Sequence, residues 1–140
     1  MSGSFPKCRG ATDLAQSKPF RRQVVLVVED EPLQQMMAVD LVEDAGFEAV
    51  KACDAEEAVR ILETRTDVRI VLTDVDMPGS VDGLMLAAAI RDRWPPIAII
   101  VTSGRVRERE VRLPSGGVFF LKPYDTRKVA QKLVEFGSRH

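Results

Sequence analysis

The stretch that decides the fold is residues 24–46, VVLVVEDEPLQQMMAVDLVEDAG, in which an apolar run leads through an acidic turn into a helical pattern. The run Val24–Val28 is typical of a strand buried on both faces of a parallel sheet. Over residues 31–45, apolar side chains return at close to helical spacing, with Pro32 in the first turn and Gly46 just after the end. Both residues favour those positions in helices. We therefore predict a strand followed by a helix, whose apolar positions are Leu33, Met36, Met37, Leu41, Val42 and Ala45.

The same alternation of strand and helix continues along the chain. We predict further strands at Phe47–Cys53, Val68–Thr73, Ile97–Val101 and Gly117–Leu121, and helices at Ala55–Arg65, Gly83–Arg93 and after Asp125. Asp54 and Glu57 predict a capping-box-like start for the second helix. The expected apolar face of the final helix consists of Val129, Leu133, Val134 and Phe136. Five such repeats predict a parallel sheet with helices on both faces.

One segment fits this pattern poorly. Residues 104–113 carry four arginines and only three apolar anchors, and a Pro-Ser-Gly-Gly sequence follows them. A fourth helix there is expected to be short or irregular. Its arginines are interpreted as a solvated charged face, with docking of a partner or ordering upon a signal as open alternatives.

Composition excludes several kinds of chemistry. The chain has 140 residues, 20 Lys and Arg, 21 Asp and Glu, and a single histidine, His140, at its last position. A catalytic triad, a histidine base and a histidine-rich zinc site are therefore excluded. The two cysteines, Cys8 and Cys53, are expected to be reduced thiols of a cytoplasmic protein. No apolar stretch is long enough to span a membrane.

The first 23 residues differ from the rest. They contain Ser, Gly and Pro with five cations and one acid, a net charge of +4, which leaves −5 for residues 24–140. We interpret residues 1–23 as a flexible N-terminal arm and residues 24–140 as one domain.

Complementary polar residues are predicted at the carboxyl ends of four strands, where ligands bind in open parallel sheets. These residues are Glu29, Asp30, Asp74, Asp76, Thr102 and Lys122. Clustered carboxylates are tolerated around a hard cation such as Mg²⁺. A carboxylate beside that metal, with a lysine and a hydroxyl nearby, is typical of a site that accepts a phosphoryl group. Taken singly, each residue has a simpler interpretation: Asp30 as a helix cap, Asp74 and Asp76 as turn residues, Lys122 as a solvated lysine.

Four segments at these positions carry a family resemblance. They are Val-Val-Glu-Asp-Glu-Pro (27–32), Leu-Thr-Asp-Val-Asp-Met-Pro-Gly (72–79), Ile-Val-Thr-Ser-Gly (100–104) and Phe-Leu-Lys-Pro-Tyr (120–124). In order and spacing the chain resembles the receiver domain of bacterial two-component response regulators. The resemblance implies an α/β, doubly wound, flavodoxin-like fold with strand order 2-1-3-4-5.

The resemblance also implies roles for the acidic residues. Asp74 matches the aspartate that accepts a phosphoryl group from a phosphohistidine of a histidine kinase or histidine phosphotransfer protein. Asp30 and Asp74 match direct ligands of Mg²⁺, with Mn²⁺ as an alternative, and Glu29 matches a ligand that acts through water. Asp76 matches the position whose backbone carbonyl completes the metal shell.

Further roles are implied on the last two strands. Thr102 matches the hydroxyl that turns toward the phosphoryl group, and Lys122 matches the lysine that pairs with it. Phe119 matches an aromatic switch residue, although an ordinary core phenylalanine is an equal alternative. The Lys122–Pro123 bond matches one that is cis in the family.

The resemblance implies a signalling protein rather than an enzyme, one that assists its own phosphorylation and dephosphorylation. Its expected output is contact with a protein target through the fourth helix, fifth strand and last helix, without nucleic acid or membrane. We expect a monomer or weak homodimer, either standing alone or excised from a longer hybrid kinase. In the family, the positions of Asp76 and Gly104 flank the path of the water that hydrolyses the acyl phosphate. We hypothesise that Asp76→Asn changes the phosphoryl lifetime.

The turn at 79–83 is one residue longer than is usual in the family, which leaves its local geometry open.

Three alternative functions are weighed. Asp74-Val75-Asp76 resembles the Asp-x-Asp nucleophile and acid pair of a haloacid-dehalogenase-type (HAD-like) phosphatase, but that family places the pair on its first strand. A flavodoxin-like electron carrier needs a phosphate loop where this chain has Glu29-Asp30-Glu31. A receiver-like binding module that is not phosphorylated would not need Asp74, Asp30, Thr102 and Lys122 together.

Overall fold

The computed structural model describes residues 22–76, 82–104 and 117–139. The elements in these ranges are β1 (Val24–Val28), α1 (Pro32–Asp44), β2 (Glu48–Ala52), α2 (Ala55–Thr64), β3 (Val68–Asp74), α3 (Gly83–Arg93), β4 (Ala98–Ser103), β5 (Val118–Leu121) and α4 (Thr126–Gly137). The N-terminal arm predicted at 1–23 falls almost entirely outside these ranges. So does nearly all of the short helix predicted within 104–113.

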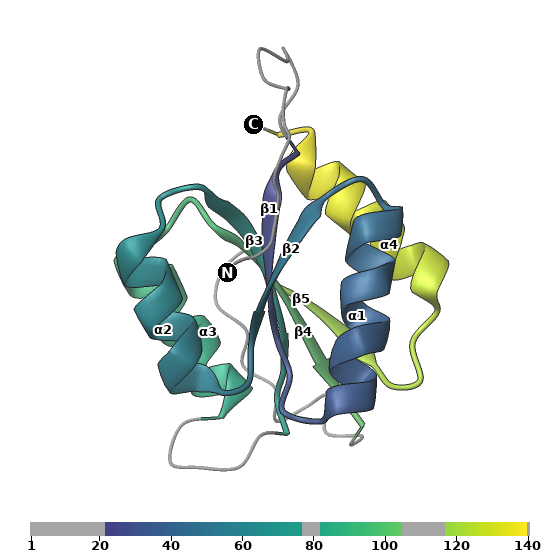
Figure 1. The fold of residues 1–140 in the computed structure, drawn as a ribbon, viewed down its shortest axis with the longest axis horizontal. Coiled ribbons are helices and arrows are strands. Elements are labelled where there is room, and N and C mark those ends of the chain that lie inside the picture. The colour runs from purple at the N-terminus through teal and green to yellow at the C-terminus, as the bar shows by residue number, and fades with distance from the viewer. Residues whose placement is uncertain (1–21, 77–81, 105–116, 140) are drawn as a thin grey trace, which may run out of the picture.

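The five strands form one parallel sheet in the order β2-β1-β3-β4-β5. Helices α1 and α4 cover one face of this sheet, and α2 and α3 cover the other (Figure 1). The predicted doubly wound fold with strand order 2-1-3-4-5 is confirmed. Because every strand is parallel, all the carboxyl ends lie along one edge of the sheet.

Two apolar cores hold the helices on the sheet. All five residues of β1 are buried, and they alternate between the two faces. One core packs Leu26 and Val71 beneath α2 and α3, and the other packs Val27 and Leu72 beneath α1 and α4. A strand that contributes to both cores must be apolar throughout, which explains the unbroken run that begins the domain.

Side-chain caps fix where the helices begin. Asp54 accepts a hydrogen bond from the amide of Glu57 at 2.8 Å, as predicted. The Glu57 carboxylate reaches back to the amide of Cys53 at 2.7 Å, so the capping box closes one residue earlier than its usual pattern. Asp82 caps α3, and Asp125 caps α4 as expected.

The buried face of α1 differs from its most apolar positions. Ala38, Leu41 and Val42 are buried, whereas the side chains of Leu33, Met36 and Met37 are more than half exposed. Each residue turns an α-helix by about 100°, so the line through 38, 41, 42 and 45 also passes through Gln34 and Gln35. This line of α1 is therefore continued at its first turn by two glutamines, of which Gln35 is partly buried and Gln34 is exposed. In α4, Val134 likewise lies off the buried line of Val129, Leu133 and Phe136 and is 53% exposed.

Two strands extend further toward the site than predicted. β3 runs to Asp74 and β4 to Ser103, because the parallel pairing continues as far as Asp74 opposite Thr102. The candidate acceptor is thus the last residue of a paired central strand. This pairing fixes the backbone of Asp74 on the side of β4.

The opposite edge of the sheet brings the two ends of the domain together. The side-chain amide of Gln23, just before β1, donates to the carbonyl of Gly137 at the end of α4 at 3.2 Å.

No helix in the described part of the chain is long and apolar enough to cross a membrane.

Candidate functional site

Three carboxylates meet where β1 and β3 end side by side. Glu29, Asp30 and Asp74 each offer an oxygen atom, and these atoms lie within 4.8 Å of one another. Glu29 and Asp74 are only 6% and 5% exposed, whereas Asp30 is exposed to solvent. The convergence that the sequence predicted for these residues is present in the structure.

The turn after β1 shows what Asp30 does not do. The N-cap of α1 is Glu31, whose carboxylate accepts from the amide of Gln34 at 2.9 Å. Glu29 in turn accepts from the amide of Glu31 at 3.2 Å. The alternative that Asp30 caps the first helix is therefore wrong, and its carboxylate belongs to the acidic cluster.

Burial makes the charged form of these acids costly. Desolvation raises the pKa of Asp74 above its ordinary value, against the opposing attraction of Lys122 and a hydrogen bond from the Asp76 amide. Desolvation also raises the pKa of Glu29, and repulsion from Asp74 adds to this rise. A cation at this position would favour both ionised carboxylates.

Lys122 supplies a cation from the end of β5. Its Nζ lies 3.3 Å from Glu29 Oε1, 3.3 Å from Asp74 Oδ1 and 2.5 Å from Gln34 Oε1. Burial alone would lower the pKa of Lys122, but the attraction of Asp74 and Glu29 outweighs burial and raises it. The ammonium is therefore held in its charged form. The following peptide bond, Lys122–Pro123, is cis.

One oxygen of the acceptor candidate is left without a donor. Asp74 Oδ1 is buried and has no hydrogen-bond partner among the described residues, because Lys122 approaches it as an ion pair without hydrogen-bond alignment. An all-oxygen donor set with such an atom fits a hard divalent cation such as Mg²⁺. The same atom can instead act as a nucleophile toward phosphorus.

The β4 end borders the same site. Thr102 is buried opposite Asp74, and its carbonyl accepts from the Val75 amide at 2.8 Å. The Asp76 carboxylate accepts from Ser103 Oγ at 3.1 Å and from the Gly104 amide at 3.2 Å. Asp76 thus links the loop after β3 to the end of β4. The predicted role of its backbone carbonyl as a metal ligand stays a prediction.

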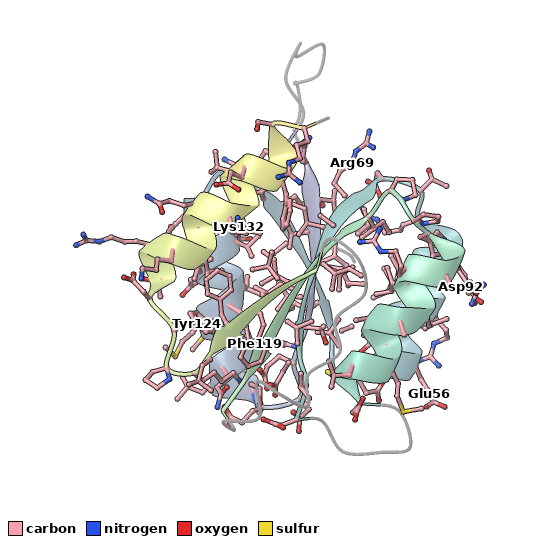
Figure 2. All side chains as sticks on the ribbon, turned by 180° about the vertical axis from the view of Figure 1, so that it is seen from behind. Glu56, Arg69, Asp92, Phe119, Tyr124 and Lys132 are labelled. Carbon is pink, nitrogen blue, oxygen red and sulfur yellow. The ribbon has the colours of Figure 1, made fainter. Side chains whose placement is uncertain are left out.

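Two aromatic residues flank Lys122 along the chain. Phe119 lies on β5, and Tyr124 lies between β5 and α4 (Figure 2). Phe119 is partly buried and packs against the core beneath α2 and α3, whereas Tyr124 packs against the other core. The contacts of Phe119 are those of a core residue at the edge of the sheet, and a switching role for it stays a prediction.

A cavity of about 530 Å³ opens next to Asp74. Its polar end is formed by Glu29, Gln34, Asp74, Thr102 and Lys122, and its walls include Met37, Leu41 and Tyr124 from α1 and the loop before α4. The side chain of Asp74 therefore lines an open cavity, although its Oδ1 atom is itself buried.

Sequence reasoning missed Gln34. A glutamine on a helix carries no functional signal by itself, and only its position four residues before the buried Ala38 points to the site, where Gln34 stays exposed to solvent. The structure places its amide oxygen against the Lys122 ammonium.

Comparison with known proteins agrees with this geometry. A family model for the response regulator receiver domain matches residues 25–134. The response regulator protein FleR of Pseudomonas aeruginosa is 31% identical over 121 residues, which cover 84% of this chain and 24% of FleR. The sensor protein TorS of Escherichia coli is 25% identical over 115 residues, 80% of this chain and 12% of TorS. The chain thus spans a quarter or less of these two relatives.

Solved structures show the same fold. A response regulator receiver protein from Pseudomonas putida is 29% identical, with a TM-score of 0.68 over 86% of this chain and 99% of that chain. The signal receiver domain of an HD domain-containing protein from Pseudomonas fluorescens has a TM-score of 0.76 at 21% identity, over 85% and 97% of the two chains. The family match covers most of the chain and all four segments that carry the site. This chain belongs to the response regulator receiver domain family.

Proposed function

We propose that Asp74 accepts a phosphoryl group from a phosphohistidine on a partner histidine kinase or histidine phosphotransfer protein. Receiver domains are signalling domains of two-component systems and interact with such partners. The observation that carries the proposal is the buried Asp74 Oδ1, which lacks a hydrogen-bond donor among the described residues and lies 3.3 Å from Lys122 Nζ, in a side chain that lines an open cavity.

Glu29, Asp30 and Asp74 would hold the divalent cation, Mg²⁺ or Mn²⁺. When bound, that cation neutralises negative charge on the carboxylates and on the transferring phosphoryl group. We assign Asp30 and Asp74 to direct contact, Glu29 to contact through water, and Asp76 to contact through its backbone carbonyl.

In the proposed reaction, an Asp74 carboxylate oxygen forms a bond to phosphorus while the phosphorus–nitrogen bond of the donor breaks. The electron pair of that bond stays on the donor imidazole, and no redox change occurs. Lys122 neutralises one phosphoryl oxygen, and the Thr102 hydroxyl donates a hydrogen bond to another. Because Asp74 carries the group covalently, this site needs no histidine of its own.

The test is incubation with Mg²⁺ and acetyl phosphate, followed by mass spectrometry of the intact protein. We expect the mass of one added phosphoryl group, lost in Asp74→Asn and abolished by EDTA. Asp54→Asn is the matched control, because Asp54 also follows a strand of the sheet but caps a helix, and asparagine keeps that cap. No added mass in the wild type would refute the proposal and leave a binding module that is not phosphorylated.

Asp76 is proposed to set the lifetime of the phosphoryl group. Its carboxylate is tied to Ser103 and Gly104 beside Thr102, and there it can orient water or repel an anionic donor. We expect Asp76→Asn to change the rate of dephosphorylation in Mg²⁺, measured as the loss of the phosphoryl mass with time. An unchanged rate would remove this role.

The HAD-like phosphatase remains as a second candidate because of the Asp74-Val75-Asp76 sequence. The structure places this pair at the end of the third strand. We expect no turnover of p-nitrophenyl phosphate, and multiple turnovers would favour the phosphatase.

The proposed output surface comprises β5, α4 and the segment before β5, and that segment lies outside the described residues.

A further inference from the structure

The Lys122 ammonium lies near three acceptor atoms of the described residues. Two of them are carboxylate oxygens, and the third is the uncharged side-chain oxygen of Gln34. A lysine ammonium has three N–H donors. Glu29 Oε1 and Asp74 Oδ1 lie 3.3 Å from Nζ, and Gln34 Oε1 lies at 2.5 Å, closer than either carboxylate. Among these three contacts, the shortest is therefore with a neutral amide.

The backbone of Gln34 is anchored at the start of α1. Its amide donates to the Glu31 carboxylate at 2.9 Å, which fixes the first turn of the helix. The neighbouring Gln35 donates from Nε2 to the carbonyls of Glu29 and Ala52, at 3.0 and 3.3 Å. These bonds tie the same turn to the ends of β1 and β2. The Gln34 side chain thus extends from a turn that is fixed to the sheet edge.

We propose that Gln34 is a positioning residue that holds the Lys122 ammonium over Asp74. This inference rests on the function proposed above. Gln34 acts through Lys122 and donates nothing to the reacting atoms itself. Lysine is a point charge on a flexible four-carbon stem, so a fixed acceptor restricts the positions that its charge can take.

The absence of charge on the Gln34 side chain is important for positioning the Lys122 ammonium. Glu29, Asp30 and Asp74 already place three carboxylates at the site. A fourth carboxylate would hold the ammonium equally well but would repel an anionic phosphodonor. An amide oxygen supplies direction without adding negative charge.

The first experiment measures the rate of phosphorylation by acetyl phosphate in Mg²⁺. Gln34→Met removes the acceptor while keeping an unbranched side chain, and we expect the rate to fall by about tenfold, since hydrogen bonds to charged groups are among the stronger ones. Met36→Ala, at an exposed position on the same helix, should stay within about twofold of the wild type. In a Lys122→Met background, Gln34→Met should cause no further loss. An equal loss in both backgrounds would overturn the proposal.

The second experiment does not depend on phosphorylation. Proton exchange of the Lys122 ammonium is measured by ¹⁵N NMR of the whole chain without a donor. We expect Gln34→Met to accelerate this exchange severalfold, and Gln34→Glu to restore slow exchange while still slowing phosphorylation. Equal exchange in the wild type and Gln34→Met would overturn the proposal. If the wild type takes up no phosphoryl group, the proposed function fails, and this exchange rate still decides whether Gln34 holds Lys122.

Discussion

Gly83, the first residue of α3, lies against the backbone of the candidate acceptor, and its replacement gives the sharpest test of the packing around the site. A Cβ at residue 83 would lie 2.2 Å from the carbonyl oxygen of Asp74 and 2.7 Å from the Cα of Val75. Both atoms belong to backbone that is held by β3 pairing and by the bond from the Val75 amide to Thr102. They cannot rotate away as a side chain would. Either α3 or the end of β3 must move by about 1 Å to restore van der Waals contact.

The cost can be worked from these contacts. Overpacking of this kind costs typically about 1–3 kcal/mol, and the rigid backbone places Gly83→Ala near the upper end. The higher helix propensity of alanine offsets at most about 1 kcal/mol of this cost. We therefore expect a net loss of about 2 kcal/mol in the free energy of unfolding. For a urea m-value of about 2 kcal/mol/M, the midpoint falls by about 1 M.

The assay is urea unfolding followed by circular dichroism, with Gly104→Ala as the matched control. Gly104 lies at the same edge of the sheet, and a Cβ there meets no atom within 4 Å among the described residues. We expect its midpoint to stay close to that of the wild type. Equal midpoints for Gly83→Ala and Gly104→Ala would refute the tight approach of α3 to Asp74.

Three further predictions concern the charges and caps of the domain. The pKa of Asp74 is higher in the fold than in the unfolded chain. Between these two pKa values the folded state binds more protons than the unfolded chain, so stability falls as the pH rises from the lower pKa to the higher one. In EDTA, Asp74→Asn should therefore raise the free energy of unfolding at pH 7 and lose this gain below about pH 4; an equal gain at pH 3 in urea titrations would contradict it. Mg²⁺ at one hundred times its Kd should stabilise the wild type by about 2.7 kcal/mol, and calorimetry showing equal stabilisation of Asp30→Asn would exclude Asp30 as a ligand. Asp54→Ala should cost about 1 kcal/mol through loss of the cap on α2, whereas Asp54→Asn should not, as measured by thermal unfolding.

The fold was predictable because its buried strands, β1 above all, are marked by apolar composition. The unbroken apolar run of β1 reflects two cores, and Asp54 and Asp125 mark the starts of helices that the structure confirms. The inward face of α1 was less predictable. Its methionines are more hydrophobic than its glutamines, yet Met36 and Met37 are exposed, because the helix phase is set by Ala38, Leu41 and Val42.

The candidate site was predictable where strand ends carry charge. Glu29, Asp30, Asp74 and Lys122 converge because parallel strands bring their carboxyl ends to one edge. The contacts of Gln34 and the tight approach of Gly83 were not predictable, since they depend on where a helix lies relative to the sheet. Helix placement follows from packing of the whole core, which local spacing does not specify.

The bond between Gln23 and Gly137 has a consequence for how this domain can be built into larger proteins. The chain enters and leaves the fold at one pole, and the length of β1, roughly 15–20 Å, separates that pole from Asp74. A segment joined directly before Gln23 or directly after Gly137 would start on the far side of the domain from the acidic residues, so it need not cover the approach to the acceptor. Because the two ends of the domain lie side by side, the whole domain can be inserted into a loop of another protein. For the same reason, a short linker can join the two ends in a circular permutant.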